Sequence, residues 1–513
     1  MLTRFSTLLA FCIVTLFLTG VFLFGDSLPR PAHPPPVPDA AVVLEPSGKD
    51  PARTASRLSG TASQSSRVAS ASSEAALATP SLFVDLFPPG QKPPAVESLR
   101  PGLLPPQRPP TEPIQIAITE SSGSHDEVIA SLVHAFGSAN GAQLHLYQLV
   151  QRYGIERLLS SFELFGNHTE AQLQHAFLKE DAITPDIVVA ATCELDIIQY
   201  SWRFEKLLAD GKTFLFCVVQ QPERWVVPWL HDAVKPWVEA GMVEFITLSP
   251  RIAEFFQNKT IPEWKTRATP PVRSFIPVFP LTLPEHGASD QELSFALQGN
   301  YEASDRDYNT ILTHLSAYLN LTSNNPPSVS EAFREWLKTQ SGTDHGSKNV
   351  TLRLVGHGAH PTVPAALQHN VVFADNLNFT DYYAALSRAF ALLPGLNASN
   401  ADFLSHSTVP SVPAALIAGT PLIASNALLD AYGYLRTAGG DQEQAVWLKN
   451  EAETEMDVVE RALVAGEEGR KNRRANVRKL CEELVKKNKV VVNEWVERAR
   501  DKIKRNMGKA AVS

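Results

Sequence analysis

Short apolar runs alternate with helical segments along most of this chain, and this alternation constrains its fold more than any other feature. Runs typical of buried strands include Ile114 to Thr119, Ile187 to Ala191 and Phe214 to Val219, and segments between such runs, for example Glu127 to Phe136, have helical periodicity. Strands that alternate with helices indicate parallel βαβ units. The sequence therefore predicts an α/β protein.

The alternation occurs twice, which predicts two Rossmann-like domains. The first spans 112–268. Five prolines then punctuate 269–292, which cannot be a helix interior or a central strand and is interpreted as an interdomain linker. A second domain of similar build spans 293–450, and helices are expected over 451–513. This division suits a chain whose folded part is too long for a single core.

The C-terminal tail concentrates the basic charge of an otherwise acidic chain. Arg470 to Ser513 holds 15 Lys and Arg against 5 Asp and Glu, although the whole chain has a net charge of −8. Acidic residues are interleaved at helical spacing, which favours a solvated helix over contact with an anionic membrane surface. Nucleic acid is the least favoured partner, and we expect none.

The N-terminus predicts a membrane anchor followed by a stem. Phe5 to Phe24 is apolar apart from Ser, Thr and Gly, and its 20 residues match the roughly 20 that cross a bilayer. A cleaved signal peptide is the alternative, but its apolar core runs only about 7–15 residues. We interpret 1–25 as a cytosolic tip and transmembrane signal anchor. The segment 26–111 holds 18 of the 38 prolines between Asp26 and Pro110 and is predicted to be a disordered stem.

This topology is that of a single-pass type II membrane protein of the Golgi or endoplasmic reticulum, with its body in the lumen. Cys12 lies in the apolar segment, and the other three cysteines show no CxxC spacing, so we expect neither a disulfide scaffold nor a zinc site. Six Asn-X-Ser/Thr sequons support the lumenal side as predicted glycosylation sites: Asn167, Asn258, Asn320, Asn349, Asn378 and Asn397.

The loop after the first strand, ESSGSHD, is the candidate acceptor-side site. Its small residues let a ligand approach the backbone, and Ser124 or Asp126 can cap the following helix. The predicted catalytic residues are His125, Asp126 and Glu120, since histidine suits general-base work near neutral pH. Ordinary βα-turn chemistry is the alternative, because no GxGxxG fingerprint is present.

The second domain offers several turns that suit a nucleotide. FALQGNY is a strand and a glycine turn, and Arg306 opens the next helix, where a guanidinium can chelate phosphate or simply lie on the surface. The LVGHG turn could admit a nucleobase or ribose, although a tight turn alone explains its two glycines. The neighbouring run VFADNLNF could hold a base by main-chain hydrogen bonds.

A further element, SHSTVPSV, precedes a short helix that leads through Gly419-Thr420-Pro421 into a strand. Hydroxyl and N–H groups at a helix start suit a diphosphate, whereas capping of the helix is the structural alternative. No metal site is expected. The predicted donor-binding residues are Gly299, Asn300, Arg306, Gly356, Gly358, Ser407, Thr408, Ser411 and Gly419.

The order of FALQGN, TLRLVGHG, VVFADNLNFTDYYAALSRAFALLPG and VPAALIAGTPLIAS resembles the C-terminal domain of GT-B glycosyltransferases, especially the retaining type that uses nucleotide-activated sugars. The resemblance covers Leu293 to Tyr434. It implies that Gly299 and Arg306 meet the donor phosphates and that Gly419 and Pro421 match the family's glycine-proline turn.

The family's two glutamates fall on His406 and Ala414, and Ala414 cannot accept hydrogen bonds from a ribose. Either Ser407, Thr408 and Ser411 replace them, or the donor differs, or catalysis has been lost. The resemblance implies a glycosyltransferase that moves a sugar from a nucleotide sugar to a glycan, protein or lipid acceptor, without a cofactor. The alternatives are an inactive lumenal carbohydrate-binding or scaffold protein and, least favoured, a sugar-phosphate hydrolase or nucleotidase.

Overall fold

The described part of the chain belongs to one compact unit, Pro101–Ser513, of a computed structural model. The predicted anchor and stem lie outside the described residues. So do the sequons Asn167, Asn349 and Asn397 and the side chain of Asn320. Among the described helices, none combines the length and apolar character needed to cross a membrane. The structure describes residues 113–162, 172–173, 176–179, 182–283, 293–302, 306–324, 350–396, 402–436 and 445–510.

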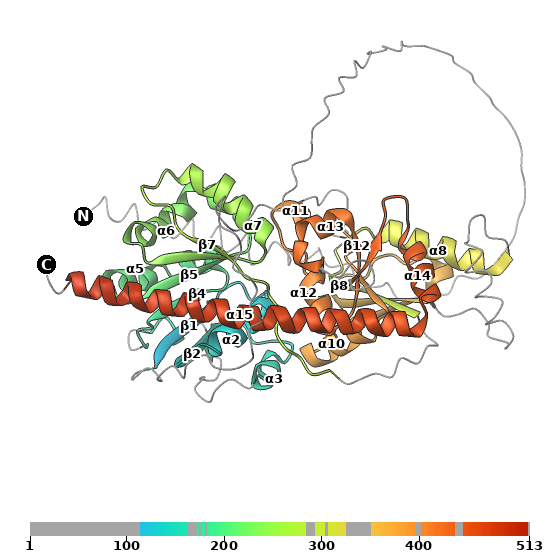
Figure 1. Cartoon of the computed structure of the whole chain (residues 1–513), viewed down its shortest axis with the longest axis horizontal. Helices are drawn as coiled ribbons and strands as arrows, with labels where there is room; N and C mark the ends of the chain where they lie inside the picture. The colour runs from blue at the N-terminus through green and yellow to red at the C-terminus, as the bar shows by residue number, and fades with distance from the viewer. Residues whose placement is uncertain are drawn as a thin grey trace, which may run out of the picture. The chain divides into compact units, whose positions relative to one another are not determined.

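The first described sheet is wholly parallel, with the order β3-β2-β1-β4-β5-β6-β7 (Figure 1). Every residue of its central strands β4 and β5 is buried, as expected for strands with helices on both faces. Its strands are β1 (Ile114–Glu120), β2 (Ala142–Gln148), β3 (Gln172–Leu173), β4 (Ile187–Ala190), β5 (Phe214–Val219), β6 (Val243–Thr247) and β7 (Val272–Ser274).

The predicted linker contains part of this sheet, which corrects its interpretation as a plain connection. β7 lies within 269–292 and pairs with β6, and Pro271 precedes it directly. An edge strand tolerates flanking prolines because one of its sides needs no ladder hydrogen bonds. The helices of this domain are α2 (Asp126–Gly137), α3 (Ile155–Ser160), α4 (Cys193–Gln199), α5 (Ser201–Asp210), η2 (Pro222–Val226), α6 (Pro228–Ala240), α7 (Pro250–Phe255), η3 (Phe256–Thr260) and η4 (Ile261–Trp264).

The second described sheet has the order β10-β9-β8-β11-β12-β13 and is also parallel. The strand order reverses between β8 and β11, and ligands collect outside the carboxyl ends of strands at such a point. The predicted α/β class with two parallel sheets is confirmed. The strands are β8 (Leu293–Asn300), β9 (Val350–His357), β10 (Val371–Asp375), β11 (Ala391–Leu393), β12 (Leu422–Ser425) and β13 (Val446–Lys449).

Helices cover both faces of the second sheet. Ile311 on α8 packs with Val459 on α14 in one core, while Leu386 on α10 and Val412 on α12 pack in another. The helices are α8 (Tyr308–Asn324), η5 (Ala365–Leu367), α10 (Phe379–Arg388), α11 (Asp402–Ser405), α12 (Ser411–Ala418), α13 (Asn426–Ala431), η6 (Gly433–Leu435) and α14 (Glu455–Val464).

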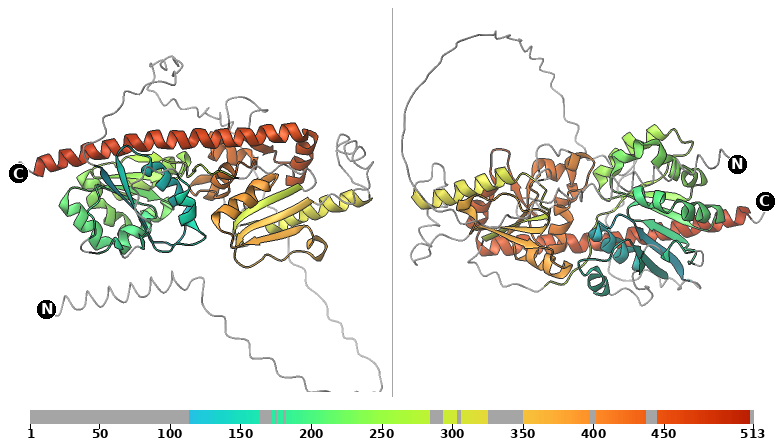
Figure 2. Two further views of the ribbon diagram at one scale, coloured as in Figure 1. Left: turned by 90° about the horizontal axis from the view of Figure 1, so that it is seen from below. Right: turned by 180° about the vertical axis from the view of Figure 1, so that it is seen from behind.

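The basic tail is the long helix α15 (Gly466–Ala510), and the expectation of a simply solvated helix is wrong (Figures 1 and 2). One face is buried: the Trp495 ring lies 6.2 Å from that of Phe216 in the first domain. Asn488 donates to the Ile276 carbonyl at 2.7 Å, and Arg474 donates to the Ser387 carbonyl at 2.6 Å in the second domain. The helix therefore braces both domains.

The structure also corrects the small weight given to the cysteines. Cys193 at the start of α4 and Cys217 on β5 form a disulfide, while Cys481 is free and buried. Cysteine spacing alone could not reveal this pair, because its partners are brought together by the neighbouring strands β4 and β5.

Candidate active site

The β1–α2 loop is held in place by a buried carboxylate. Glu120 is 1% exposed, and its Oε1 accepts from the Ser122 N–H at 2.7 Å and from the Ser124 N–H at 3.3 Å. A carboxylate that accepts several loop amides fixes the loop's shape. The structure thus places Glu120 beneath the loop, and the catalytic role predicted for it has no exposed oxygen to support it.

His125 occupies the N-cap position of α2 in the left-handed conformation, with φ of 65°, and makes no side-chain capping bond. The capping predicted for Ser124 or Asp126 is therefore not what starts this helix. Desolvation of the imidazole, and then the charge of Arg152, lower the pKa of His125 to about 4, although the residue as a whole is exposed. The imidazole is therefore neutral at neutral pH and is a weaker base than an ordinary histidine.

Asp126 lies buried in the first turn of α2, where its Oδ2 is 3.4 Å from the Arg152 Nε. Burial, and then the charge of Glu127, raise the pKa of Asp126 to about 7, against the opposing charge of Arg152. Asp126 therefore titrates close to neutral pH, where a group that exchanges protons is useful.

Glu127, in the first turn of α2, was missed by the sequence reasoning. It is half-buried, and burial raises its pKa against the attraction of Arg152 and of His357 in the other domain. Its charge also acts on Tyr382 of α10. The signal that could have found it was its place in the first turn of a helix that starts at a strand's carboxyl end.

The predicted glycines of the second domain serve a close backbone approach. A Cβ on Gly356 would lie 1.8 Å from the Gly299 carbonyl oxygen, and Gly299 itself has φ of 113°. Gly358 has φ of 112°, and a Cβ there would lie 2.7 Å from the Asn300 Oδ1. Gly299 and Gly356 are paired residues of β8 and β9, and Gly358 follows β9, so close backbone packing explains all three glycines, while binding of a donor by them stays a prediction.

Arg306 is 7% exposed and bonded to the main chain. Its Nη1 donates to the Pro394 carbonyl at 2.5 Å and its Nη2 to the Gln298 carbonyl at 2.9 Å. These bonds tie the end of β8 to the end of β11 across the point where the strand order reverses. Its placement indicates support of the site's framework, and contact with a donor phosphate remains a prediction.

Hydrogen bonds connect the start of α12 with α10 and β8. The Tyr382 hydroxyl donates to Gln298 Oε1 at 2.6 Å, and Gln298 Nε2 donates to the Ser411 hydroxyl at 3.4 Å. The Thr408 hydroxyl oxygen is buried and has no hydrogen-bond partner in the described part of the chain. The carbonyl of Ser407 accepts from a tyrosine hydroxyl at 3.3 Å. Gln298 on β8 thus connects Ser411 to the strand next to the reversal point, while binding of a donor by Ser411 and Thr408 stays a prediction.

Gly419 lies at the other end of α12, and this corrects its assignment to the donor site. It is the C-cap of α12, with φ of 65°, and a Cβ there would lie 2.9 Å from the Arg478 Cγ on α15. Because it precedes β12, it lies at the amino edge of the parallel sheet, opposite Ser411. Because Gly419 has no side chain, α12 can pack closely against Arg478 of α15.

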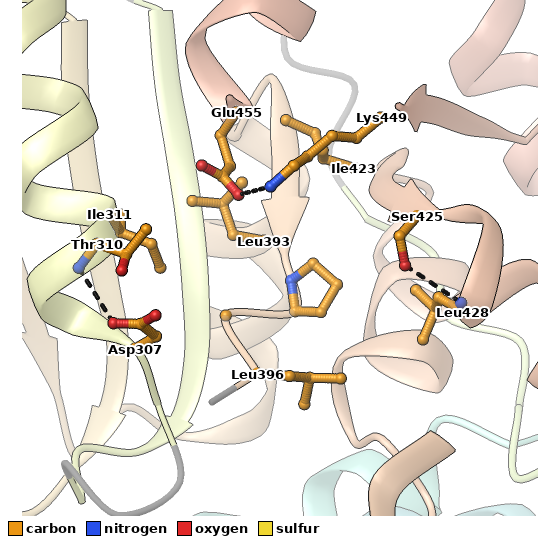
Figure 3. Close-up of a pocket in the computed structure, with 12 residues that line it drawn as sticks. Asp307, Thr310, Ile311, Leu393, Leu396, Ile423, Ser425, Leu428, Lys449 and Glu455 are labelled. Atoms are coloured by element: carbon orange, nitrogen blue, oxygen red, sulfur yellow. Dashed lines mark hydrogen bonds and ion pairs between the residues drawn. The ribbon is translucent and has the colours of Figure 1, made fainter. Parts of the chain in front are cut away.

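A cavity of about 210 Å³ lies at the carboxyl ends of β11, β12 and β13 (Figure 3). Its rim includes Asp307 and the ion pair of Lys449 with Glu455 at 2.5 Å. None of the predicted donor residues lines it. No cluster of three metal-ligating side chains occurs in the part of the chain that the structure describes.

A scan against protein-family models found no match, and a search of curated proteins found none. Among solved structures, the chain is similar to the pneumococcal O-GlcNAc transferase GtfA in complex with UDP and GlcNAc, with 14% identity over 62% of this chain and 57% of that one, at a TM-score of 0.34. An α-glucosyltransferase in complex with UDP gives 11% identity over 72% and 95%, at 0.44.

The glycotransferase of kitacinnamycin gives 13% identity over 75% of this chain and 99% of that one, at a TM-score of 0.38. At these identities and scores the likeness concerns fold and identifies neither substrate nor reaction. The structure itself shows two parallel α/β domains that are both contacted by α15.

Proposed function

We propose that this protein is a glycosyltransferase that moves a sugar from a nucleotide-activated donor to a hydroxyl-bearing glycan, protein or lipid acceptor. The observation that carries the proposal is that a loop at the carboxyl edge of the first sheet contacts the carboxyl edge of the second. The Tyr153 carbonyl accepts from the Phe379 N–H at 2.9 Å, and the Tyr153 ring lies 6.3 Å from that of His357. A reaction between two substrates needs groups of two domains brought together in this way.

The second domain would bind the donor. Ser411 and the unpartnered Thr408 hydroxyl lie at the start of α12, where partial positive charge favours a diphosphate. Stabilising the departing nucleotide diphosphate assists transfer, because negative charge develops there in the transition state. The scheme uses no cofactor, since the nucleotide sugar is itself a substrate.

The first domain would supply the proton acceptor for the acceptor hydroxyl. The candidates are neutral His125 and the carboxyls of Asp126 and Glu127. Burial lowers the pKa of His125 and raises the pKa values of Asp126 and Glu127. General-base assistance of this type contributes about 10²–10⁴-fold in rate. Glu120 would act only as a positioning residue.

The lumen of the Golgi or endoplasmic reticulum is the proposed location, with one N-terminal helix in the membrane. The apolar segment 5–24 and the sequons support it. The Cys193–Cys217 disulfide adds independent support, because disulfides persist in oxidising compartments and are rare in the cytosol.

The test is transfer itself. The purified chain would be incubated with UDP- and GDP-sugars and with glycan acceptors, and nucleotide release and product mass would be followed. Acceptor-dependent release supports the proposal. Absence of release with every donor, from a folded sample that still binds glycan, contradicts it.

One observation favours a second candidate, a carbohydrate-binding protein on a GT-B framework. Ala414 occupies a position at which the GT-B family that the sequence resembles has a glutamate. Ala414 is apolar and 3% exposed. Arg306 is bonded to carbonyl groups. This candidate predicts glycan binding without nucleotide binding.

A further inference from the structure

The two α/β domains meet where the β2–α3 loop contacts the start of α10. The Phe379 N–H donates to the Tyr153 carbonyl at 2.9 Å. The Tyr153 ring lies 6.4 Å from that of Phe379, edge-on, and 6.3 Å from that of His357. A Cβ on Gly154 would lie 3.6 Å from the Asn378 Cβ. We call the contact of Tyr153 and Gly154 with Asn378 and Phe379 the latch.

Backbone conformation on both sides marks the latch as a specific contact. Tyr153 has φ of 52°, Gly154 has φ of 67°, and Asn376, two residues before Asn378, has φ of 50°. For residues with a side chain this left-handed region costs about 1 kcal/mol or more, and it persists where surrounding contacts enforce it. Tyr153 itself makes the contact and Asn376 lies on the loop that leads to Asn378, so both loops have backbone conformations that their surroundings enforce.

The latch is connected to the candidate active site on each side. Arg152, which precedes Tyr153, pairs with Asp126. On the other side, the His357 ring lies 6.3 Å from the Tyr153 ring, and the Tyr382 hydroxyl of α10 donates to Gln298. Separation of the latch would therefore displace groups of both halves of the site.

Asn378 belongs to both the latch and a sequon, Asn378-Phe379-Thr380. It is the N-cap of α10: its Oδ1 accepts from the Asp381 N–H at 3.0 Å, and its Nδ2 donates to the Asp381 carboxylate at 2.6 Å. The side chain is half-buried, whereas the sequon asparagine Asn258 on η3 is exposed.

We propose that glycosylation of Asn378 and closure of the latch exclude each other, which makes this sequon a regulatory modification site of the candidate active site. Glycosylation joins Nδ2 to the anomeric carbon of an oligosaccharide, breaks that carbon's bond to a lipid diphosphate and releases one Nδ2 proton. The first sugar would then start within one side chain's length of Gly154 and compete with the β2–α3 loop for space. The proposal rests on the proposed lumenal location.

Occupancy of the sequons tests it directly. The full chain would be expressed in eukaryotic cells, and the folded fraction digested and analysed by mass spectrometry of glycopeptides. Asn258 should carry glycan while Asn378 stays almost unmodified. Tyr153→Ala, which removes the latch ring, should raise Asn378 occupancy about tenfold. Val150→Ala changes an exposed residue of the same loop and should leave it unchanged.

Gly154→Ala strains the latch loop, because a side chain is disfavoured at its φ of 67°, and replaces Tyr153→Ala if that variant fails to fold. Thr380→Ala removes the sequon but keeps the Asn378 cap, and should match the parent in melting temperature. Full glycosylation of Asn378 in the folded parent, or equal occupancy in parent and latch variants, would overturn the proposal. So would absence of glycan from Asn258 and Asn378 alike. Occupancy is read by mass, so it is independent of whether the protein transfers sugar.

Discussion

The carboxyl edges of the two sheets are built from different chemistry. The edge of the first sheet holds acids and an imidazole whose pKa values burial displaces, among them His125, Asp126 and Asp196. The edge of the second sheet holds glycine turns and hydroxyls such as Ser411 and Thr408. This contrast predicts proton exchange in the first domain and directed hydrogen bonds to a ligand in the second.

The largest expected effect is on the rate of transfer after Glu127→Gln. If the first domain carries the proton chemistry, kcat should fall by about 10²–10⁴-fold, because the amide accepts no proton. Nucleotide binding should be retained. Steady-state kinetics with the bound nucleotide sugar measures this, with the exposed Glu205→Gln on α5 as the matched control. An unchanged kcat would show that Glu127 is not the proton acceptor.

The pH dependence of stability sharpens the contrast. Burial raises the pKa of Asp196 to about 7, with hydrogen bonds from Ser121 and Thr192 opposing the rise. In the unfolded chain the carboxyl titrates near its ordinary value, so between about pH 4 and 7 the unfolded state binds fewer protons. The free energy of unfolding should fall as pH rises through this window, by up to about 4 kcal/mol, and then level off.

Asp196→Asn should reduce the fall in the free energy of unfolding with rising pH. Urea denaturation at pH 5 and pH 8 measures this difference. Asp126 titrates in the same window, so part of the slope should remain. A variant with the full slope of the parent would show that Asp196 is not the group responsible.

Gly356→Ala tests whether the second edge depends on backbone approach. Its Cβ would meet the Gly299 carbonyl oxygen at 1.8 Å, so we expect a loss of about 3 kcal/mol in the free energy of unfolding. Chemical denaturation gives this value. Gly433→Ala is the matched control, because a Cβ there would have no atom within 4 Å. Equal effects of the two would contradict the close approach.

The smallest expected effect is that of Thr408→Val. The buried hydroxyl has no partner in the described structure, so its loss should leave stability within about 1 kcal/mol of the parent. If the hydroxyl binds the donor, nucleotide affinity should fall about tenfold, as measured by titration calorimetry. Unchanged affinity would remove Thr408 from the donor site.

Local patterns were enough to predict the α/β class and most strands, since period and burial are encoded within each segment. They were not enough for contacts made across the chain. Gly419 was assigned to the donor site because the resemblance matches it to the family's glycine-proline turn, but a helix of eight residues separates it from Ser411 and places it at the opposite edge of the sheet. The Cys193–Cys217 disulfide and the burial of α15 likewise depend on tertiary packing.

Site residues show the same limit. His125 and Asp126 were recognisable from a strand–loop–helix pattern, whereas Glu127 stands out only through its neighbours in the other domain. Arg306 was recognisable as a cation, but its carbonyl partners come from β8 and from the residue after β11.

The most direct test of the division between the two edges is thermal stabilisation by nucleotides. A ligand that binds only the folded chain at about 100 times its Kd adds about 2.7 kcal/mol to stability and raises the melting temperature. We predict that UDP or GDP gives such a rise, equal in the parent and in Glu127→Gln. A folded sample whose melting temperature no nucleotide raises would contradict a donor site on the second domain.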